Sequence, residues 1–188
     1  MNVPDVRPRT CEGSPSTSLY HQIPETWEYS TNSDRRFILE TDRDEYKFVV
    51  NEFNKRMNGK YSQIVQIERI QNKRWYMQYL AHRVDFKKRL NMETEKLLFH
   101  GCPEQAAKAI IEDCFNRSFA GVNVWLWNIV LILGTAYGYG VYFSANAIYS
   151  HGYARPNSKG EKFLFLSRVL IGKVTSGNST MKARPVGI

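Results

Sequence analysis

The sequence predicts an α+β fold, in which helices and short strands follow one another without the regular βαβ alternation of a parallel sheet. Two observations lead to this prediction. Several segments carry apolar residues at helical spacing. Several short runs rich in β-branched or aromatic residues are typical of strands. The chain also contains neither GxGxxG after a strand nor GxxxxGKS/T, so neither standard phosphate-binding loop is present.

Two helices and one strand are predicted in the first half of the chain. Apolar residues recur at helical spacing between Asp44 and Met57, and either Asp42 or Asp44 could cap that helix. Residues 64–70 form a short β-branched run, which predicts a strand. Residues 73–90 predict a second helix with Arg83, Lys87 and Lys88 on one side. Its apolar side is expected to consist of Tyr76, Tyr79, Leu80 and Val84.

Three strands and one helix are predicted in the second half. Residues 96–101 read as a buried strand that ends in a turn. Pro103 suits the first position of a following helix. Residues 140–143 form a short strand between glycine-rich turns, and residues 163–171 form a long hydrophobic one. The apolar face of the helix after Pro103 is expected to consist of Ala106, Ala107, Ile110 and Ile111.

The composition indicates one folded domain preceded by a tail. The chain has 188 residues, of which 43% are hydrophobic, which is enough for one domain with a core. Residues 1–22 contain Pro4, Pro8 and Pro15 among small polar residues and predict a flexible tail or linker. The folded domain is therefore expected over residues 23–188.

The cysteines and the N-terminus indicate the cellular compartment. Cys11, Cys102 and Cys114 form no CxxC pair and no zinc-ligand spacing, so we expect a reducing compartment and no metal site. No basic segment followed by an apolar run is present at the N-terminus, so the expected localisation is cytoplasmic, nuclear or both. The most apolar run, residues 124–133, has about half the length of a membrane-spanning helix.

The net charge of +8 is concentrated in one part of the chain. Residues 55–96 contain eleven Lys or Arg and four Asp or Glu. A basic face attracts nucleic acid, acidic protein or polyphosphate. The aromatic residues between these charges have a helical spacing that suits a buried face better than a base-stacking surface. A solvated helix face is therefore favoured over nucleic-acid binding.

Three short stretches are more informative in their order than any of them is alone. They are residues 97–101, which end in His-Gly, residues 115–118, and residues 137–153, which begin Tyr-Gly-Tyr-Gly-Val-Tyr-Phe and end with Ser150 and Tyr153. A single histidine at a strand end is more often structural than catalytic. A Gly-x-Gly sequence is usually a tight turn, and several of the eleven tyrosines must have ordinary packing roles.

Together these stretches resemble the poly(ADP-ribose) polymerase family of diphtheria-toxin-like ADP-ribosyltransferases, and most closely its macrodomain-associated mono-ADP-ribosyltransferase branch. Residues 67–72, Trp75, residues 93–101 and residues 168–172 resemble that branch as well. The resemblance runs from about residue 24 to about residue 185. It implies the ADP-ribosyltransferase fold, with mixed, mostly antiparallel sheets and flanking helices, and NAD as a co-substrate without a metal.

The resemblance implies roles for three residues at the reacting part of NAD. His100 would hydrogen-bond a ribose hydroxyl, and the backbone of Gly101 would hold the nicotinamide carboxamide, which the absence of a Cβ permits. Tyr142 would be the second member of the family's catalytic triad, after His100, and would pack along the nicotinamide riboside. Breaking the glycosidic bond makes an oxocarbenium-like ribose, so the enzyme's main task is to hold sugar and leaving group rigidly.

The resemblance also implies three further NAD-binding residues. Ser150 would hydrogen-bond the carboxamide, Tyr153 would stack on the nicotinamide ring, and Arg117 would lie near the adenosine or pyrophosphate. These residue types fit the ligand, because an aromatic slot attracts a flat cationic ring. An amide also needs one donor and one acceptor in fixed positions.

The sequence departs from the family in four places. Cys102 stands where the family usually has Thr or Ser, and Tyr139 stands where Lys is common. About eleven extra apolar residues, at about 124–134, lie in the loop that closes over NAD in the family. They could plug the site, dock a partner or a membrane surface, disturb folding, or be translated non-coding sequence. The family also continues with strands beyond the match to residues 168–172, one of which carries the third triad position, so we expect an incomplete domain.

Three functions therefore remain open. The first is a protein mono-ADP-ribosyltransferase, which transfers ADP-ribose from NAD to a protein side chain and releases nicotinamide. The second is a catalytically dead NAD-site protein or binding module, favoured by the insertion and by the expected missing strands. The third is nucleic-acid binding, whose sign would be a steep loss of affinity with salt. The sequence does not predict the acceptor residue or the oligomeric state.

Overall fold

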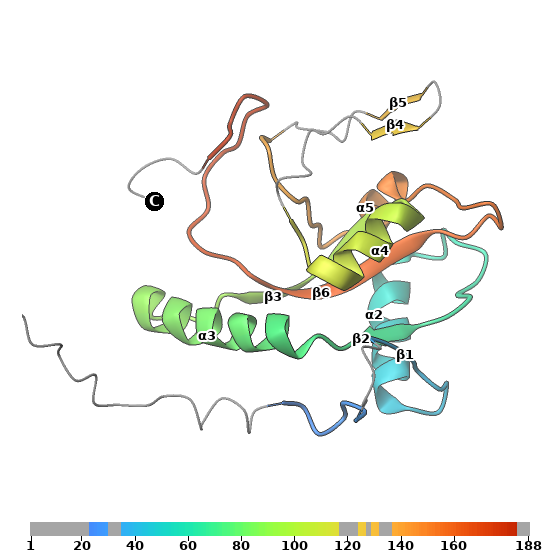
Figure 1. Ribbon diagram of the computed structural model, residues 1–188, viewed down its shortest axis with the longest axis horizontal. Coiled ribbons are helices and arrows are strands. Elements are labelled where there is room, and N and C mark those ends of the chain that lie inside the picture. Colours follow the sequence, from blue (N-terminus) through green and yellow to red (C-terminus); the bar gives the residue numbers. More distant parts are fainter. Residues whose placement is uncertain (1–22, 30–34, 117–123, 127–128, 132–136, 184–188) are drawn as a thin grey trace, which may run out of the picture.

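A computed structural model describes residues 23–29, 35–116, 124–126, 129–131 and 137–183 of the chain (Figure 1). The predicted α+β class is confirmed, since the described helices accompany small antiparallel sheets. The elements in order are β1 (Arg36–Ile38), α2 (Asp44–Met57), β2 (Glu68–Ile70), α3 (Lys73–Leu90), β3 (Glu95–Cys102), α4 (Glu104–Asp113), β4 (Val124–Leu126), β5 (Ile129–Leu131), α5 (Ala147–Tyr153) and β6 (Phe163–Leu170).

The strand β3 is the centre of the described structure. It pairs antiparallel with β6 along its whole length, from Glu95 opposite Leu170 to Cys102 opposite Phe163. On its other edge, Phe99 exchanges two backbone hydrogen bonds of 2.8 and 2.9 Å with Ser144. Figure 1 shows α4 and α5 on one side of the β3–β6 pair and α3 on the opposite side.

The core lies where α2 and α5 meet β3. Met57 at the end of α2, Phe99 on β3 and Ala147 at the start of α5 are almost completely buried. Phe53 and Tyr61 pack against this cluster, with their ring centroids 4.9 Å apart. The burial of these apolar side chains fixes α5 against the strand that carries His100.

Both long helices agree with their predicted ranges, but two details were wrong. Neither Asp42 nor Asp44 caps α2, because the cap position is Arg43, which makes no side-chain cap hydrogen bond, and Asp44 is already inside the first turn. Acidic residues there still interact favourably with the helix dipole. On α3, Leu80 is buried as expected, whereas Val84 is 60% exposed, because little of the described chain packs against the second half of this helix.

The strand predictions were less accurate. Of residues 64–70 only Glu68–Ile70 pair in a ladder, with β1. Residues 140–143 form no strand, since the chain makes only the single bridge at Ser144. Residues 163–171 were predicted almost to the residue. Pro103 is the cap of the following helix and not its first residue. In that helix, Ala107 and Ile111 form the buried face.

A buried ion-pair network holds the start of the domain to β2. The Arg69 side chain is 7% exposed, and its guanidinium lies 2.6 Å from Glu45 and 3.3 Å from Glu28. It also donates to Gln71 at 2.9 Å, and the Gln71 amide donates to the Glu28 carbonyl at 2.9 Å. A buried guanidinium is tolerated only when it is paired in this way.

Several cations of the basic segment are engaged in ion pairs. On α3, for example, Lys87 lies 2.6 Å from Glu93 and Arg83 lies 3.8 Å from Glu95. Such pairs reduce the field that the segment presents to a polyanion. The cations of the segment that form ion pairs include Lys55, Arg56, Arg69, Arg83, Lys87 and Arg89.

Two short paired strands lie within the predicted apolar insertion. Strands β4 and β5 pair antiparallel, with Val124 opposite Leu131 and Leu126 opposite Ile129. Residues 127–128 and 132–134 of the insertion lie outside the described chain. Within the described chain, no helix has the length and apolar character needed to cross a membrane.

Candidate active site

The histidine of the predicted triad is held in an aromatic box at the end of β3. The His100 ring lies 5.2 Å from Phe115 and 5.5 Å from Phe143, centroid to centroid. Phe165, its partner across the β3–β6 ladder, lies 6.4 Å away. These contacts restrict the orientation of the imidazole before any ligand binds.

One hydrogen bond fixes the proton on this imidazole. Nδ1 of His100 is 2.8 Å from the backbone carbonyl of Tyr142. A carbonyl can only accept, so Nδ1 donates, and in the neutral ring Nε2 is left as an acceptor. Burial lowers the pKa of His100 below its ordinary 6.5, and the bond to Tyr142 opposes this only in part. The ring is therefore neutral at pH 7 and able to accept from a sugar hydroxyl.

A strained residue places Phe115 against the histidine. Cys114 ends α4 with φ 63° and ψ −177°, a conformation found almost only at glycine. Its N–H donates to Ile110 O at 2.8 Å. The chain turns sharply there, and the next residue, Phe115, meets His100 edge-on and lies 4.8 Å from Phe143.

Ser150, the predicted partner of the carboxamide, joins β3 directly to α5. The Ser150 hydroxyl donates to the Phe99 carbonyl at 3.0 Å, and Ser150 is only 4% exposed. A Cβ on Gly101 would overlap the Ser150 carbonyl oxygen and lie 2.7 Å from its carbonyl carbon. Gly101 is thus required for the close approach of α5, independently of any ligand. The Ser150 oxygen retains lone pairs that can accept from a carboxamide N–H.

The sequence around Asn146 explains why α5 begins where it does. The Asn146 side chain caps the helix by accepting from the N–H groups of Ile148 at 2.9 Å and Tyr149 at 3.3 Å. Asn146 itself donates its N–H to the Ser144 hydroxyl at 3.0 Å. This helix was not predicted, although an Asn cap before an apolar run is a recognisable start signal.

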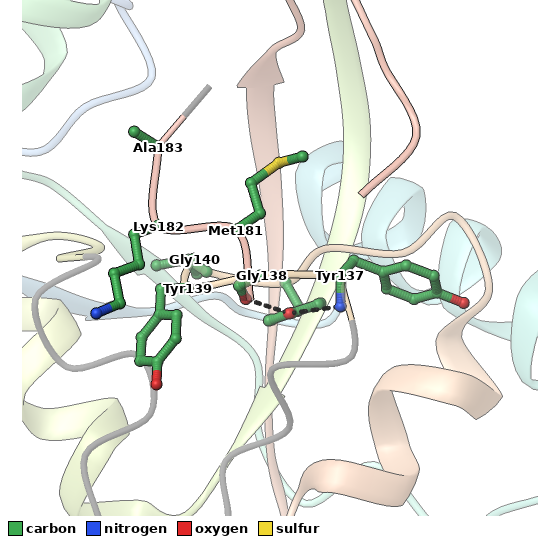
Figure 2. Close-up of a pocket in the computed structure, with 9 residues that line it drawn as sticks. Tyr137, Gly138, Tyr139, Gly140, Met181, Lys182 and Ala183 are labelled. Carbon is green, nitrogen blue, oxygen red and sulfur yellow. Dashed lines mark hydrogen bonds between the residues drawn. The ribbon is translucent and has the colours of Figure 1, made fainter. Parts of the chain in front are cut away.

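Tyr142 belongs to a closed turn, residues 137–142, called here the tyrosine turn. Its hydroxyl accepts from the Tyr137 N–H at 3.1 Å and donates to the Gly138 carbonyl, as the dashed lines in Figure 2 show. The Tyr142 carbonyl, and not its hydroxyl, is the group that bonds His100. The structure thus joins the two predicted triad residues, but through the tyrosine's backbone and not through its hydroxyl.

The tyrosine turn forms one wall of a pocket of about 230 Å³. Residues 181–183 form the opposite wall. In Figure 2, Tyr137 and Tyr139 extend from the turn in different directions, and Lys182 lies on the same side as Tyr139. The pocket therefore adjoins the residue whose carbonyl orients His100.

Tyr153 is paired with Tyr149, which the sequence motifs did not indicate. The hydroxyls of Tyr153 and Tyr149 are 2.9 Å apart, and their rings lie 5.2 Å apart on α5. This hydrogen bond raises the pKa of the Tyr153 phenol, and slight burial and the nearby phenols of Tyr137 and Tyr142 act in the same direction. Tyr153 is 47% exposed, so part of its side chain is accessible to a ligand. The i,i+4 spacing was the available signal for Tyr149.

Two further residues discussed from the sequence are Cys102 and Arg117. Burial raises the pKa of the Cys102 thiol to about 12, so it stays protonated and is a poor nucleophile. Arg117, expected near the adenosine or pyrophosphate, lies outside the described residues. Among the residues that are described, no three His, Cys, Asp or Glu side chains gather as a metal site would require.

These features agree with the similarity of the chain to known proteins. Residues 43–186 match the poly(ADP-ribose) polymerase catalytic domain. The chain is 33% identical over 155 residues to mouse protein mono-ADP-ribosyltransferase PARP10, which covers 80% of the chain. It is 37% identical over 145 residues to human PARP14 and 30% identical over 168 residues to human PARP12, covering 75% and 87% of the chain.

Both human relatives are also named protein mono-ADP-ribosyltransferases. The aligned regions make up 15%, 7% and 22% of the PARP10, PARP14 and PARP12 sequences, so the chain spans a minor part of each. The family match covers well over half of the chain, and the described site contains the His-Gly, Tyr-Phe and Ser elements in the order that the resemblance implied. The chain belongs to the poly(ADP-ribose) polymerase catalytic-domain family.

Proposed function

We propose that this chain is an NAD-dependent protein mono-ADP-ribosyltransferase. The observation that carries the proposal is the fixed, neutral imidazole of His100, directly followed by Gly101, on which Ser150 is packed. The names of the relatives specify mono-ADP-ribosyl transfer and therefore support this activity over polymer formation.

The roles of the residues follow from their hydrogen-bonding capacities. Nε2 of His100 accepts from a hydroxyl of the nicotinamide ribose, and Ser150 accepts from the carboxamide N–H. Tyr153, which is about half exposed and has its hydroxyl held by Tyr149, stacks on the nicotinamide ring. These contacts hold the leaving group and the sugar in one orientation.

The reaction exchanges one bond at the ribose for another. The bond between the ribose C1′ and the nicotinamide nitrogen breaks, and its electron pair leaves with nicotinamide. A nucleophilic atom of the acceptor protein bonds to C1′, and its proton passes to solvent. The transition state is oxocarbenium-like, so rigid positioning of the sugar by His100 lowers the barrier.

The alternative is an NAD-site binding module without transfer activity. The closed tyrosine turn favours it, because the Tyr142 hydroxyl is already engaged by Tyr137 and Gly138. A protein of this kind would bind a nicotinamide mimic but would release no nicotinamide from NAD.

The test measures ligand binding and nicotinamide release separately. Benzamide, a nicotinamide mimic, should raise the melting temperature of the full chain, because ligands stabilise the state they bind. Nicotinamide release from NAD should be lost in His100→Ala and kept in His82→Ala, a matched change of an exposed histidine on α3. Binding without release would support the binding module.

A version lacking residues 124–134 completes the experiment. A benzamide shift that is gained only on this deletion would show that the insertion blocks the site. The absence of any benzamide shift in both forms, with a cooperative melt in each, would contradict the proposed function.

A further inference from the structure

The segment after β6 crosses over the tyrosine turn. Residues 177–181, called here the crossing segment, form a tight bend in which Asn178 Oδ1 accepts from the Thr180 N–H at 3.1 Å and from the Thr180 hydroxyl at 2.8 Å. The bend brings the Met181 carbonyl to the Tyr139 N–H at 2.8 Å. In Figure 2 the chain around Met181 lies beside the turn at Gly138.

The two segments approach each other so closely that each has a glycine at the contact. A Cβ on Gly177 would lie 2.5 Å from the Tyr137 carbonyl oxygen and 3.2 Å from its carbonyl carbon. A Cβ on Gly138 would lie 2.6 Å from the Met181 carbonyl oxygen. The obstacles are backbone atoms, which cannot rotate away as the end of a side chain can. Any side chain at Gly177 must therefore push the crossing segment and the start of the tyrosine turn apart.

The tyrosine turn transmits such a displacement toward the histidine. Its ends are tied together, because the Tyr142 hydroxyl bonds both the Tyr137 N–H and the Gly138 carbonyl. Tyr142 also provides the carbonyl that accepts from Nδ1 of His100 at 2.8 Å. Movement at Tyr137 therefore alters the group that sets the His100 tautomer.

We propose that the crossing segment positions the tyrosine turn and, through it, the Tyr142 carbonyl that orients His100. Gly177 is the positioning residue on which this arrangement depends. The segment acts on the reaction only through His100 and touches no reacting atom. Its link to catalysis rests on the proposed function, whereas its effect on the imidazole can be measured without NAD.

The test compares Gly177→Ala with Gly172→Ala in the full chain. Gly172 is the matched control, because a Cβ there would meet only Phe86 Cε2, at an ordinary 3.7 Å. The readout is the His100 imidazole in ¹H–¹⁵N NMR, which distinguishes a proton on Nδ1 from one on Nε2. Gly177→Ala should lose the Nδ1–H signature, and Gly172→Ala should keep it.

The kinetic readout separates positioning from general loss of structure. An ångström-scale displacement of the imidazole should lower the rate of nicotinamide release by about a hundredfold. Benzamide has no ribose, so its affinity should fall far less than the rate. An unchanged His100 tautomer in a folded Gly177→Ala protein overturns the proposal, as does an equal fall in rate and benzamide affinity.

A milder variant keeps the test decisive if Gly177→Ala fails to fold. Asn178→Ala removes the side chain that holds the bend, without adding any atom near the turn. It should shift the His100 tautomer in the same direction but only in part. A wild-type signature in this variant then overturns the proposal. If the unaltered chain releases no nicotinamide, the proposed function fails, while the tautomer result still decides this inference.

Discussion

The contact between Gly101 and α5 gives a stability prediction that does not depend on any ligand. Alanine at position 101 would place a Cβ 2.7 Å from the Ser150 carbonyl carbon. Carbon atoms pack at about 3.5–4.0 Å, so β3 and α5 would have to separate by roughly 0.8 Å or more. Both sides of the clash are backbone, and the α5 residue Ala147 is fully buried against Phe99. Relief by side-chain rotation is therefore excluded.

The expected magnitude follows from known costs of overpacking. Such insertions cost about 1–3 kcal/mol, and the backbone clash places Gly101→Ala at about 2–3 kcal/mol. For a chain of this size each kcal/mol lowers the melting temperature by about 2–4 °C, so we expect a decrease of roughly 4–12 °C. Thermal unfolding followed by circular dichroism, without ligand, measures it.

The matched control for this experiment is a change of the opposite sign on the same helix. Gly152 lies in α5 with nothing within 4 Å of its would-be Cβ. Gly152→Ala should therefore stabilise the protein, by about 0.5–1 kcal/mol, because glycine is unfavourable inside a helix. The reasoning would be refuted by a Gly101→Ala protein that melts within about 1 °C of the unaltered chain.

Four further predictions concern the site and its supports. Tyr149→Phe should return the pKa of Tyr153 toward its ordinary value of 10, seen by ultraviolet titration, and weaken benzamide binding about two- to fivefold. Arg69→Met should cost about 2 kcal/mol in urea unfolding, because its two glutamate partners lose their cation but remain partly solvated. Cys114→Gly should stabilise the protein by about 1 kcal/mol by relieving a positive φ, and an unchanged urea midpoint would show that no strain resides there. Folding lowers the pKa of His100, so as the pH falls the unfolded chain binds this proton before the folded chain does. The resulting contribution to the free energy of unfolding is present above pH 6.5 and declines as the pH falls below it. It should be absent from the pH dependence of stability of His100→Gln.

Local patterns predicted the elements that obey a single strong periodicity. The range of α2 followed from its apolar spacing, and α3 also begins at an Asn72 cap, whose side chain accepts from the Trp75 N–H at 3.3 Å. The strand β6 is apolar on both faces, so its boundaries were visible in composition alone. In each case the information lies within one segment of the chain.

Features that depend on contacts between distant segments could not be read in this way. The turn before Phe143 looked like a strand because its composition is β-prone, yet it gains only the bridge of Phe99 to Ser144. The exposure of Val84 depends on what lies opposite α3, which periodicity does not specify. The role of Gly177 depends on Tyr137, forty positions earlier, and nothing in its own neighbourhood indicates that contact.

The candidate site was located by the order of its motifs, and the structure added how its parts are joined. Sequence alone could not show that Tyr142 meets His100 through a carbonyl, or that Ser150 closes onto the carbonyl of Phe99. The ligand contacts of Gly101, Ser150 and Tyr153 stay predictions. The contact of Arg117 with NAD stays a prediction as well.

The pairing of β3 with β6 has a kinetic consequence. Cys102 pairs with Phe163 and Glu95 with Leu170, so about sixty residues or more separate each pair along the chain. Contacts of this range are entropically slow to close and are expected late in folding. During synthesis, the strand with His100 leaves the ribosome long before its partner. The imidazole therefore meets Phe165 only after the 64 residues between them have been made. A nascent chain paused before residue 163 holds every predicted NAD-binding residue without this wall of the site.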